Sequence, residues 1–215
     1  MMAKSSFFSL MATLATAAAL SFSCSTTRVL EEGQYRLASN KVEVIGDSKF
    51  NTKKVESYIK QKPNSYIIFG WNPFLNLYNW SGRNPDKAIN RLIRSIGTAP
   101  VVYQPSQVEA SIENINRHLE YLGYYGSDVR SDIEVKGRKV NVTYSITLGK
   151  RFRIGEITYS VPDGEFKEDF LADTSATTVR SGDYLSEDAL EKETERCASA
   201  MRRKGYFGFT KNYFS

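Results

Sequence analysis

A helical pattern that occurs twice is the feature that most constrains this chain. Residues 106–125 place apolar side chains at three- and four-residue steps, on one face of a helix, at Val108, Ile112, Ile115, Leu119 and Leu122. Ser106 and Glu109 have the spacing of a capping box, and Gly123 stands where a terminating glycine is expected. About eighty residues later, residues 186–207 repeat the serine start, the amphipathic helix and the Gly-aromatic-aromatic ending. The recurrence predicts two copies of one small domain.

The residues after the first of these helices predict a β-hairpin. Runs 128–135 and 140–148 alternate apolar and polar residues, and the turn-like segment 136–139 separates them. In the first run the residues expected on the buried face are Val129, Ser131, Ile133 and Val135, and those expected on the wet face are Arg130, Asp132 and Glu134.

The remaining patterns complete an α+β unit with the order β-α-α-β-β. Strand 35–45, with a break near residue 40, and helix 51–61 precede the hairpin in the first copy. A second copy begins with strand 153–161 and short helix 166–172, and the chain given ends in the start of a strand at 208–214. We therefore predict domain 1 at 35–150, with an inserted segment at 64–100, and domain 2 at 151–215, incomplete at its C-terminus. A missing strand leaves an unpaired edge, so we expect the front of a longer protein or a truncated product.

The inserted segment is rich in aromatic residues between Tyr66 and Trp80, and a basic amphipathic helix follows at 85–96. We expect Ile89, Leu92, Ile93 and Ile96 to point inward from this helix. Tryptophan and tyrosine favour interfaces, so the aromatic run fits a surface for lipid or a partner. The alternative, which we favour, is that the insertion packs its aromatics on its own domain.

The first residues predict export. Lys4 precedes an apolar stretch at 7–20 that is too short to span a bilayer comfortably, and Cys24 follows the small residue Ser23. This pattern predicts a signal peptide at 1–23 and a lipid tether at 24–34, with the acyl chains, palmitate among them, on Cys24. The alternative is an ordinary secretory cleavage with an incidental cysteine. Ser25 is not acidic, so the sequence does not argue for retention at an inner membrane.

Composition and motifs exclude several classes of function. The chain has 215 residues and a net charge of +5, but no concentrated basic face, which argues against nucleic-acid binding. His118 is the single histidine, and no spacing supports a nucleophile–base pair, a metal site or a phosphate-binding loop. We expect no enzyme and no cofactor. Cys197 lies on the apolar side of the second repeated helix and is interpreted as a buried apolar residue rather than a reactive thiol.

Three motifs carry a resemblance to a known family. Residues 149–157, GKRFRIGEI, are similar to the junction between consecutive POTRA domains, and residues 122–125 and 204–207 are similar to the end of the second POTRA helix. The front of the chain, with Cys24, residues 33–35 and 40–42 and the stretch 61–64, resembles lipidated outer-membrane assembly proteins of the TamA/BamA type.

The resemblance implies the periplasm-facing part of a machine that assembles outer-membrane β-barrels, held in the outer membrane by a lipid anchor. It implies unfolded outer-membrane proteins as clients and other assembly proteins as partners. In POTRA folds the middle strand tends to lie at the sheet edge, where a client strand can pair by β-augmentation. The corresponding residues here are Val129, Arg130, Ser131, Asp132, Ile133, Glu134 and Val135. The alternatives are an edge protected by its charges with no client, a stand-alone lipoprotein that acts as an envelope scaffold, and a periplasmic enzyme of unrecognised type.

Overall fold

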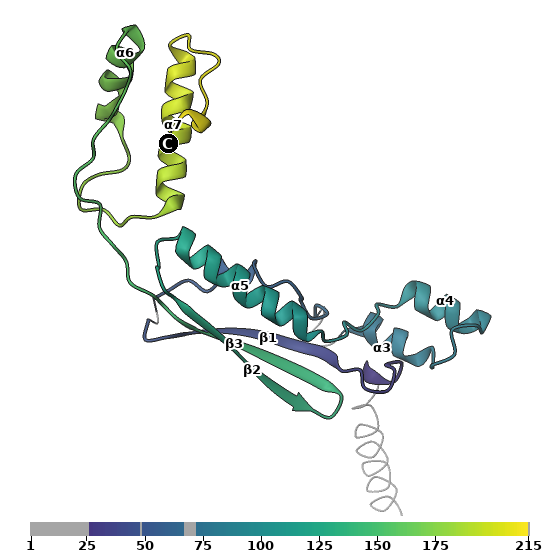
Figure 1. Ribbon diagram of the computed structural model, residues 1–215. Helices are drawn as coiled ribbons and strands as arrows, with labels where there is room; N and C mark the ends of the chain where they lie inside the picture. The colour runs from purple at the N-terminus through teal and green to yellow at the C-terminus, as the bar shows by residue number, and fades with distance from the viewer. Residues whose placement is uncertain (1–25, 48, 67–71, 215) are drawn as a thin grey trace, which may run out of the picture. The chain divides into compact units, whose positions relative to one another are not determined.

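The computed structural model describes residues 26–47, 49–66 and 72–214 (Figure 1). The fold is α+β. Its helices and strands, in chain order, are β1 (Arg36–Ile45), α2 (Lys53–Glu56), α3 (Pro73–Trp80), α4 (Ala88–Ile96), α5 (Pro105–Tyr121), β2 (Asp128–Lys136), β3 (Lys139–Thr147), α6 (Glu165–Asp173), the 3-10 helix η2 (Thr174–Ala176), α7 (Glu187–Arg203) and the 3-10 helix η3 (Lys211–Tyr213). The predicted signal peptide and Cys24 lie outside the described residues.

The three strands form one mixed sheet in the order β1-β3-β2 (Figure 1). The Arg36 N–H donates to the Arg138 carbonyl at 2.9 Å, and the Ser39 hydroxyl donates to Asn141 Oδ1 at 2.7 Å. Both pairs join residues 102 positions apart, since 138 − 36 and 141 − 39 are equal, so β1 runs parallel to β3. The predicted hairpin 128–148 is confirmed as β2 and β3, which are antiparallel.

The chain forms two compact units, each built from several stretches. The first contains the described parts of 1–41, 61–107 and 132–143, and the second contains the described parts of 42–60, 108–131 and 144–215. The core residues of the first unit are Leu30, Leu37, Ala38, Leu75, Val140 and Val142. In the second unit, residues 42–60, 108–131 and 144–147 contribute eight core residues: Val55, Ile59, Val108, Ile115, Leu119, Val129, Tyr144 and Ile146.

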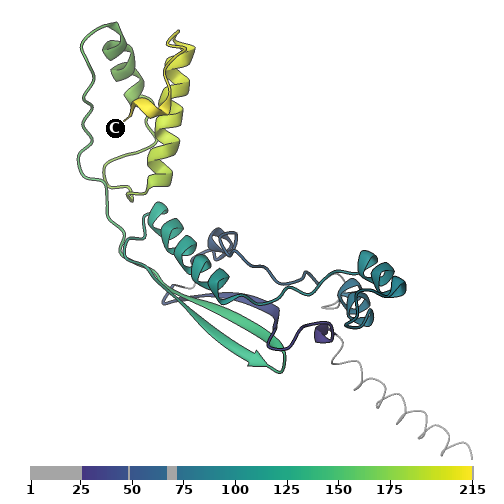
Figure 2. The ribbon, with the colours of Figure 1, turned by 45° about the vertical axis from the view of Figure 1, so that its right-hand side comes forward.

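In the first unit, the predicted insertion forms the helix pair α3 and α4, which lie side by side (Figure 2). Asn64 holds its two ends together: its amide donates to the Ala99 carbonyl at 2.8 Å and accepts from the Val101 N–H at 3.0 Å. Asn72 caps α3, because its side-chain oxygen accepts from the Leu75 N–H at 2.9 Å. These buried amides, together with the buried side chain of Leu75, attach the segment to the first unit.

Helix α4 turns its apolar row outward, which corrects the sequence prediction. Ile89, Leu92 and Ile96, expected inward, are 59%, 57% and 57% exposed. The helix is held from its other side by Arg94 and by Gly97, where an added Cβ would lie 2.7 Å from the Tyr78 backbone nitrogen. Hydrophobic spacing defines an apolar face but does not say what that face meets, and here polar contacts decide the orientation.

The two predicted amphipathic helices are present as α5 and α7, and they end in the same way. Gly123 and Gly205 adopt left-handed φ values of 88° and 106°. The Tyr124 N–H donates to the Leu119 carbonyl at 2.8 Å, and the Tyr206 N–H donates to the Met201 carbonyl at 3.2 Å. Both are the long bond of a Schellman motif, which satisfies carbonyls left open at a helix end.

The beginnings of the two helices differ from each other. Ser186 caps α7, since its hydroxyl accepts from the Ala189 N–H at 3.2 Å. The predicted cap at Ser106 is wrong, because α5 already begins at Pro105, a residue suited to the first helical turn.

The region predicted as domain 2 contains fewer strands than the sequence predicts. Within the described part of 151–214, the predicted strands 153–161 and 208–214 are replaced by a single bridge between Arg153 and Tyr184 and by the short helix η3. Helices α6 and α7 pack together (Figure 2) around Phe170, Cys197, Ala200 and Met201, and the residues packed against this cluster include Val161, Phe209 and Phe214. Apolar residues of the two expected strands therefore pack against α6 and α7 and do not form a sheet. Helix α2 is also shorter than the predicted 51–61.

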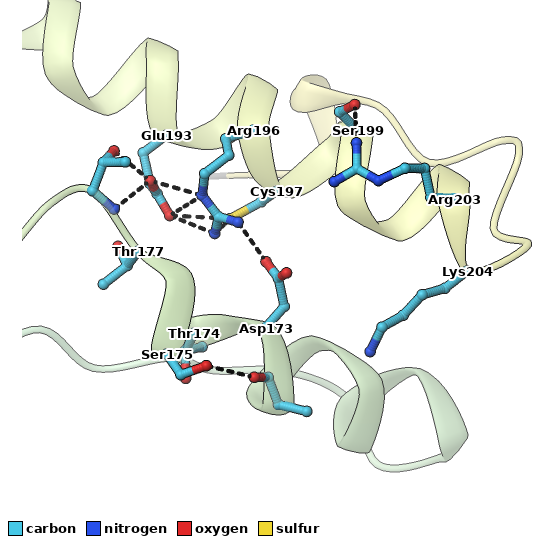
Figure 3. A network of polar contacts seen from close by, with 12 residues as sticks. Asp173, Thr174, Ser175, Thr177, Glu193, Arg196, Cys197, Ser199, Arg203 and Lys204 are labelled. Carbon is cyan, nitrogen blue, oxygen red and sulfur yellow. Dashed lines mark hydrogen bonds and ion pairs between the residues drawn. The ribbon is translucent and has the colours of Figure 1, made fainter.

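A polar network joins α6 to α7 (Figure 3). Arg196 forms ion pairs with Asp173 at 2.9 Å and with Glu193 at 2.8 Å. Glu193 also accepts from the Thr178 N–H at 2.9 Å. Burial disfavours the charged form of Glu193, but the hydrogen bonds from Arg196 and Thr178 outweigh it and lower the pKa of its carboxyl to about 2. Beside this network the Cys197 thiol is buried, as the sequence predicts, and burial together with a hydrogen bond to Glu193 raises its pKa to about 11.

Candidate functional site

The two edges of the sheet differ at the end where the hairpin turns. There β1 is already paired on its outer side: the Leu37 N–H donates to the Val101 carbonyl at 2.8 Å, and the Tyr103 N–H donates to the Tyr35 carbonyl at 2.8 Å. On the other side of the sheet, β2 is the last strand, and no described residue forms a strand or bridge outside it. The predicted edge strand is therefore an edge strand in the structure.

The turn of the hairpin determines which backbone groups of β2 are free. Gly137, with φ of 61°, and Arg138 form a two-residue turn, which makes Lys136 and Lys139 a hydrogen-bonded pair. Pairing alternates along an antiparallel ladder, so the even-numbered residues of β2 direct their N–H and C=O groups toward β3. The odd-numbered residues direct theirs to the open side. These residues are Val129, Ser131, Ile133 and Val135.

The inner face of β2 is less covered than the sequence predicts. In β3 the alternate residues from Val140 to Ile146 are all buried, whereas in β2 Val129 alone is buried. Ile133 and Val135 are 44% and 53% exposed, which corrects the expectation that they are buried. An edge strand has a neighbour on one side only, so its inner side chains lack cover on the other. Ile133 and Val135 thus combine exposed apolar side chains with backbone groups that face the open side of the sheet.

The outer face of β2 is charged, as predicted. Arg130 pairs with Asp128 at 2.8 Å and Lys136 pairs with Glu134 at 2.8 Å, all four side chains being exposed. Glu134 also accepts a hydrogen bond from Asn141 on β3 at 3.4 Å. The hydrogen bond from Lys136 lowers the pKa of Glu134, so this carboxylate stays ionised at neutral pH. Exposed pairs of this kind contribute little to stability, but they discourage indiscriminate strand pairing.

A cavity surrounds the single histidine, His118. This 410 Å³ cavity in the second unit is lined by Tyr58, Asn114, Arg117, His118, Tyr121 and Glu187. The His118 ring stacks on Tyr58 with centroids 3.9 Å apart, and burial lowers its pKa. This lining offers no serine, threonine or cysteine as a nucleophile. In the parts of the chain that the structure describes, no group of three metal-ligating side chains occurs.

Of the predicted site residues, the structure brings the seven residues of the edge strand together and leaves Cys24 outside its described ranges. Sequence reasoning missed two features. Asn141 has no motif around it, and its contact with Glu134 depends on the register of the hairpin. The aliphatic row of α4 could be recognised in the sequence, but the sequence did not show that this row faces outward.

Comparison with known proteins agrees with this architecture. A family model described as POTRA, surface antigen variable number repeat, matches residues 38–149, which is more than half of the chain. The chain belongs to the POTRA family, whose domains are non-catalytic.

The chain is also similar to a solved structure, the crystal structure of POTRA domains 3–5 of BamA from Haemophilus influenzae. The identity is 10%, the match covers 83% of this chain and 89% of that chain, and the TM-score is 0.28. No curated protein matches the sequence. Among the described helices, none combines the length and the apolar character needed to cross a membrane.

Proposed function

We propose that this chain is the POTRA region of a factor that assembles or translocates outer-membrane β-barrel proteins, and that β2 binds a client strand by β-augmentation. The observation that carries the proposal is the position of β2 at the sheet edge, whereas β1, the strand at the opposite edge, is already paired at the same end. An added strand would meet the backbone groups of Val129, Ser131, Ile133 and Val135.

The side chains favour a particular kind of client. A strand from a membrane β-barrel alternates apolar and polar residues. Paired with β2, its apolar residues would continue the inner face beside Ile133 and Val135, which are half exposed. Its polar residues would lie on the charged outer face. Backbone pairing is nearly independent of sequence, which suits a receptor with many clients.

The remaining features of the proposal are supported by the sequence. Export, a lipid on Cys24, outer-membrane attachment facing the periplasm, contact with other assembly proteins and a tandem second domain at 151–215 are parts of the same proposal. A stand-alone lipoprotein that only bridges envelope proteins is the alternative, and it would bind partners without binding barrel strands.

The test changes one backbone donor and keeps the fold. In Ile133→Pro, the lost N–H points to the open side, so the β2–β3 ladder keeps its bonds and the variant is expected to fold. Binding of a synthetic barrel-strand peptide, measured by fluorescence anisotropy, should fall by about tenfold or more, because a donor is lost and the ring obstructs an incoming strand.

The matched control is Ile133→Ala, which removes the side chain and keeps the N–H. If backbone pairing dominates, this variant retains most of the affinity. A folded Ile133→Pro protein that binds the peptide as well as the wild type would refute β2 as the docking strand. Absence of peptide binding by the wild-type protein would favour the scaffold alternative.

A further inference from the structure

Among the described residues of the first unit, the large apolar side chains with the highest exposed fractions lie on the helix pair α3 and α4. Along α4, Ile89, Leu92 and Ile96 lie at positions i, i+3 and i+7, which places them on one face of the helix. More than half of each side chain is exposed, and Trp80 at the end of α3 is 62% exposed. We call the three aliphatic residues the α4 row. Single exposed apolar residues are ordinary, but a complete helical face is not.

The outward direction of the α4 row is imposed by contacts on the opposite side of the helix. Arg94 donates from Nε to the Ser81 hydroxyl at 2.9 Å and from Nη2 to the Gly82 carbonyl at 2.8 Å. Its guanidinium also lies 5.4 Å from the centre of the Tyr78 ring. A rotation of α4 that buried the row would break these bonds and expose the cation's partners. The apolar face is thus presented to whatever lies outside the unit.

The charge of the segment indicates what covers it. Between residues 72 and 99 there are four cations, Arg83, Lys87, Arg91 and Arg94, and one anion, Asp86, which gives 4 − 1 = +3. Lys87 and Arg91 are exposed, and each lies two residues from Ile89 in the sequence. A short helix with an aliphatic face, a nearby tryptophan and surplus cations has the composition of an interfacial helix on an anionic membrane. With nine residues, α4 is only about 14 Å long, so it can lie in a bilayer surface but cannot cross it.

We propose that the α4 row inserts into the surface of an anionic phospholipid membrane, with Lys87 and Arg91 at the level of the headgroups. A second copy of the chain fits less well, because two segments of charge +3 would repel each other. The membrane supplies an apolar phase that can cover the α4 row and negative headgroups that can pair with the cations.

The N-terminal segment lies against the same helix pair. The Arg28 carbonyl accepts from Arg83 Nε at 3.3 Å, the Val29 N–H donates to Asn79 Oδ1 at 3.4 Å, and Leu30 is buried. Cys24 precedes Arg28 by four residues, a reach of at most about 14 Å of chain. This step rests on the proposed lipid anchor: acyl chains on Cys24 would hold the α4 row close to the bilayer, and the row would add a membrane contact of its own.

The experiment separates the α4 row from the lipid and from the client edge. The full chain carrying Cys24→Ser, so that no lipid contributes, is floated with phosphatidylcholine vesicles with and without phosphatidylglycerol. We expect binding to the anionic vesicles that weakens as salt rises. The triple variant Ile89→Gln, Leu92→Gln, Ile96→Gln should bind these vesicles at least about tenfold more weakly, because burial of aliphatic surface is lost.

The matched control removes three other exposed aliphatic residues, Ile45→Gln, Leu171→Gln and Leu190→Gln, whose exposed fractions are 61%, 41% and 41%. It should bind vesicles like the parent. With Trp71→Phe, the fluorescence of Trp80 becomes the single tryptophan signal and should shift to the blue on binding.

Equal vesicle binding by the triple variant and the parent would overturn the inference. So would concentration-dependent dimerisation that the triple variant abolishes in the absence of vesicle binding, because it would assign the row to a second copy. The triple variant should still bind the barrel-strand peptide. Ile133→Pro should lose peptide binding and keep vesicle binding, whereas the triple variant should lose vesicle binding and keep peptide binding. The two assays therefore test the two proposals separately.

Discussion

Two glycines that end the repeated helices offer a paired test of the second unit. Gly123 and Gly205 both have left-handed φ values, so alanine at either position costs about 1 kcal/mol or somewhat more from backbone conformation alone. Their surroundings differ. At Gly205 an added Cβ meets nothing within 4 Å, whereas at Gly123 it would overlap the Leu185 carbonyl oxygen and lie 3.2 Å from Ser186 Cβ.

The difference between the two substitutions can be worked out from these surroundings. Gly205→Ala should lose about 1 kcal/mol, which for a chain of this length lowers Tm by about 2–4 °C. Gly123→Ala carries the same conformational cost and also forces a backbone carbonyl away. Overpacking of that kind costs about 1–3 kcal/mol, so the total is about 3 kcal/mol and the fall in Tm about 6–12 °C.

Thermal melts followed by circular dichroism, with urea denaturation as a second measure, would check the prediction. The Gly205→Ala variant serves as the control for backbone strain. Equal losses in the two variants would show that Leu185 does not lie against Gly123 in solution, and the reasoning from close approach would be refuted.

The remaining predictions concern the network between α6 and α7. The pKa of Glu193 is depressed in the folded protein, so its contribution to stability is present above pH about 4.5 and is lost as pH falls toward about 2. Glu193→Gln should therefore cost about 1–2 kcal/mol at neutral pH, where Arg196 loses one of its two ion-pair partners, and much less near pH 2. The exposed control Glu195→Gln should change the stability little at either pH. A loss of stability in Glu193→Gln that is the same at both pH values would contradict the assignment. In a Cys24→Ser background, Cys197 should resist iodoacetamide at neutral pH in the folded protein and react once urea unfolds it, measured by mass, because burial raises its thiol pKa to about 11. Rapid alkylation of the native protein would show that the thiol is accessible.

The sequence predicts well what depends on local periodicity. The repeated helices α5 and α7, their glycine endings and the hairpin β2–β3 follow from spacing and turn residues that act within a few positions. The register of the hairpin then places Ile133 and Val135 on the face that was expected. Their exposure could not be predicted from the pattern, because it depends on the absence of a neighbour beyond β2.

Features that depend on distant contacts were predicted less well. The row of Ile89, Leu92 and Ile96 has the period of a buried helical face, but Arg94 fixes the helix in the opposite orientation. Residues 153–161 alternate like a strand, yet a strand forms only when a partner supplies the ladder, and the structure provides one bridge at Arg153. Local sequence patterns therefore predicted where helices and strands could form, but not which other parts of the chain these segments contact.

The asymmetry of the sheet at its hairpin end has a consequence for stoichiometry. There the outer side of β1 is occupied by residues 101–103, while β2 remains open. At this end the domain therefore has one open edge of its own, so it can add one strand directly to its sheet there. Two copies that paired β2 with β2 would close on each other and consume both sites. Such pairing would be self-limiting, and the apparent affinity for a client strand would fall as the concentration of the protein rises.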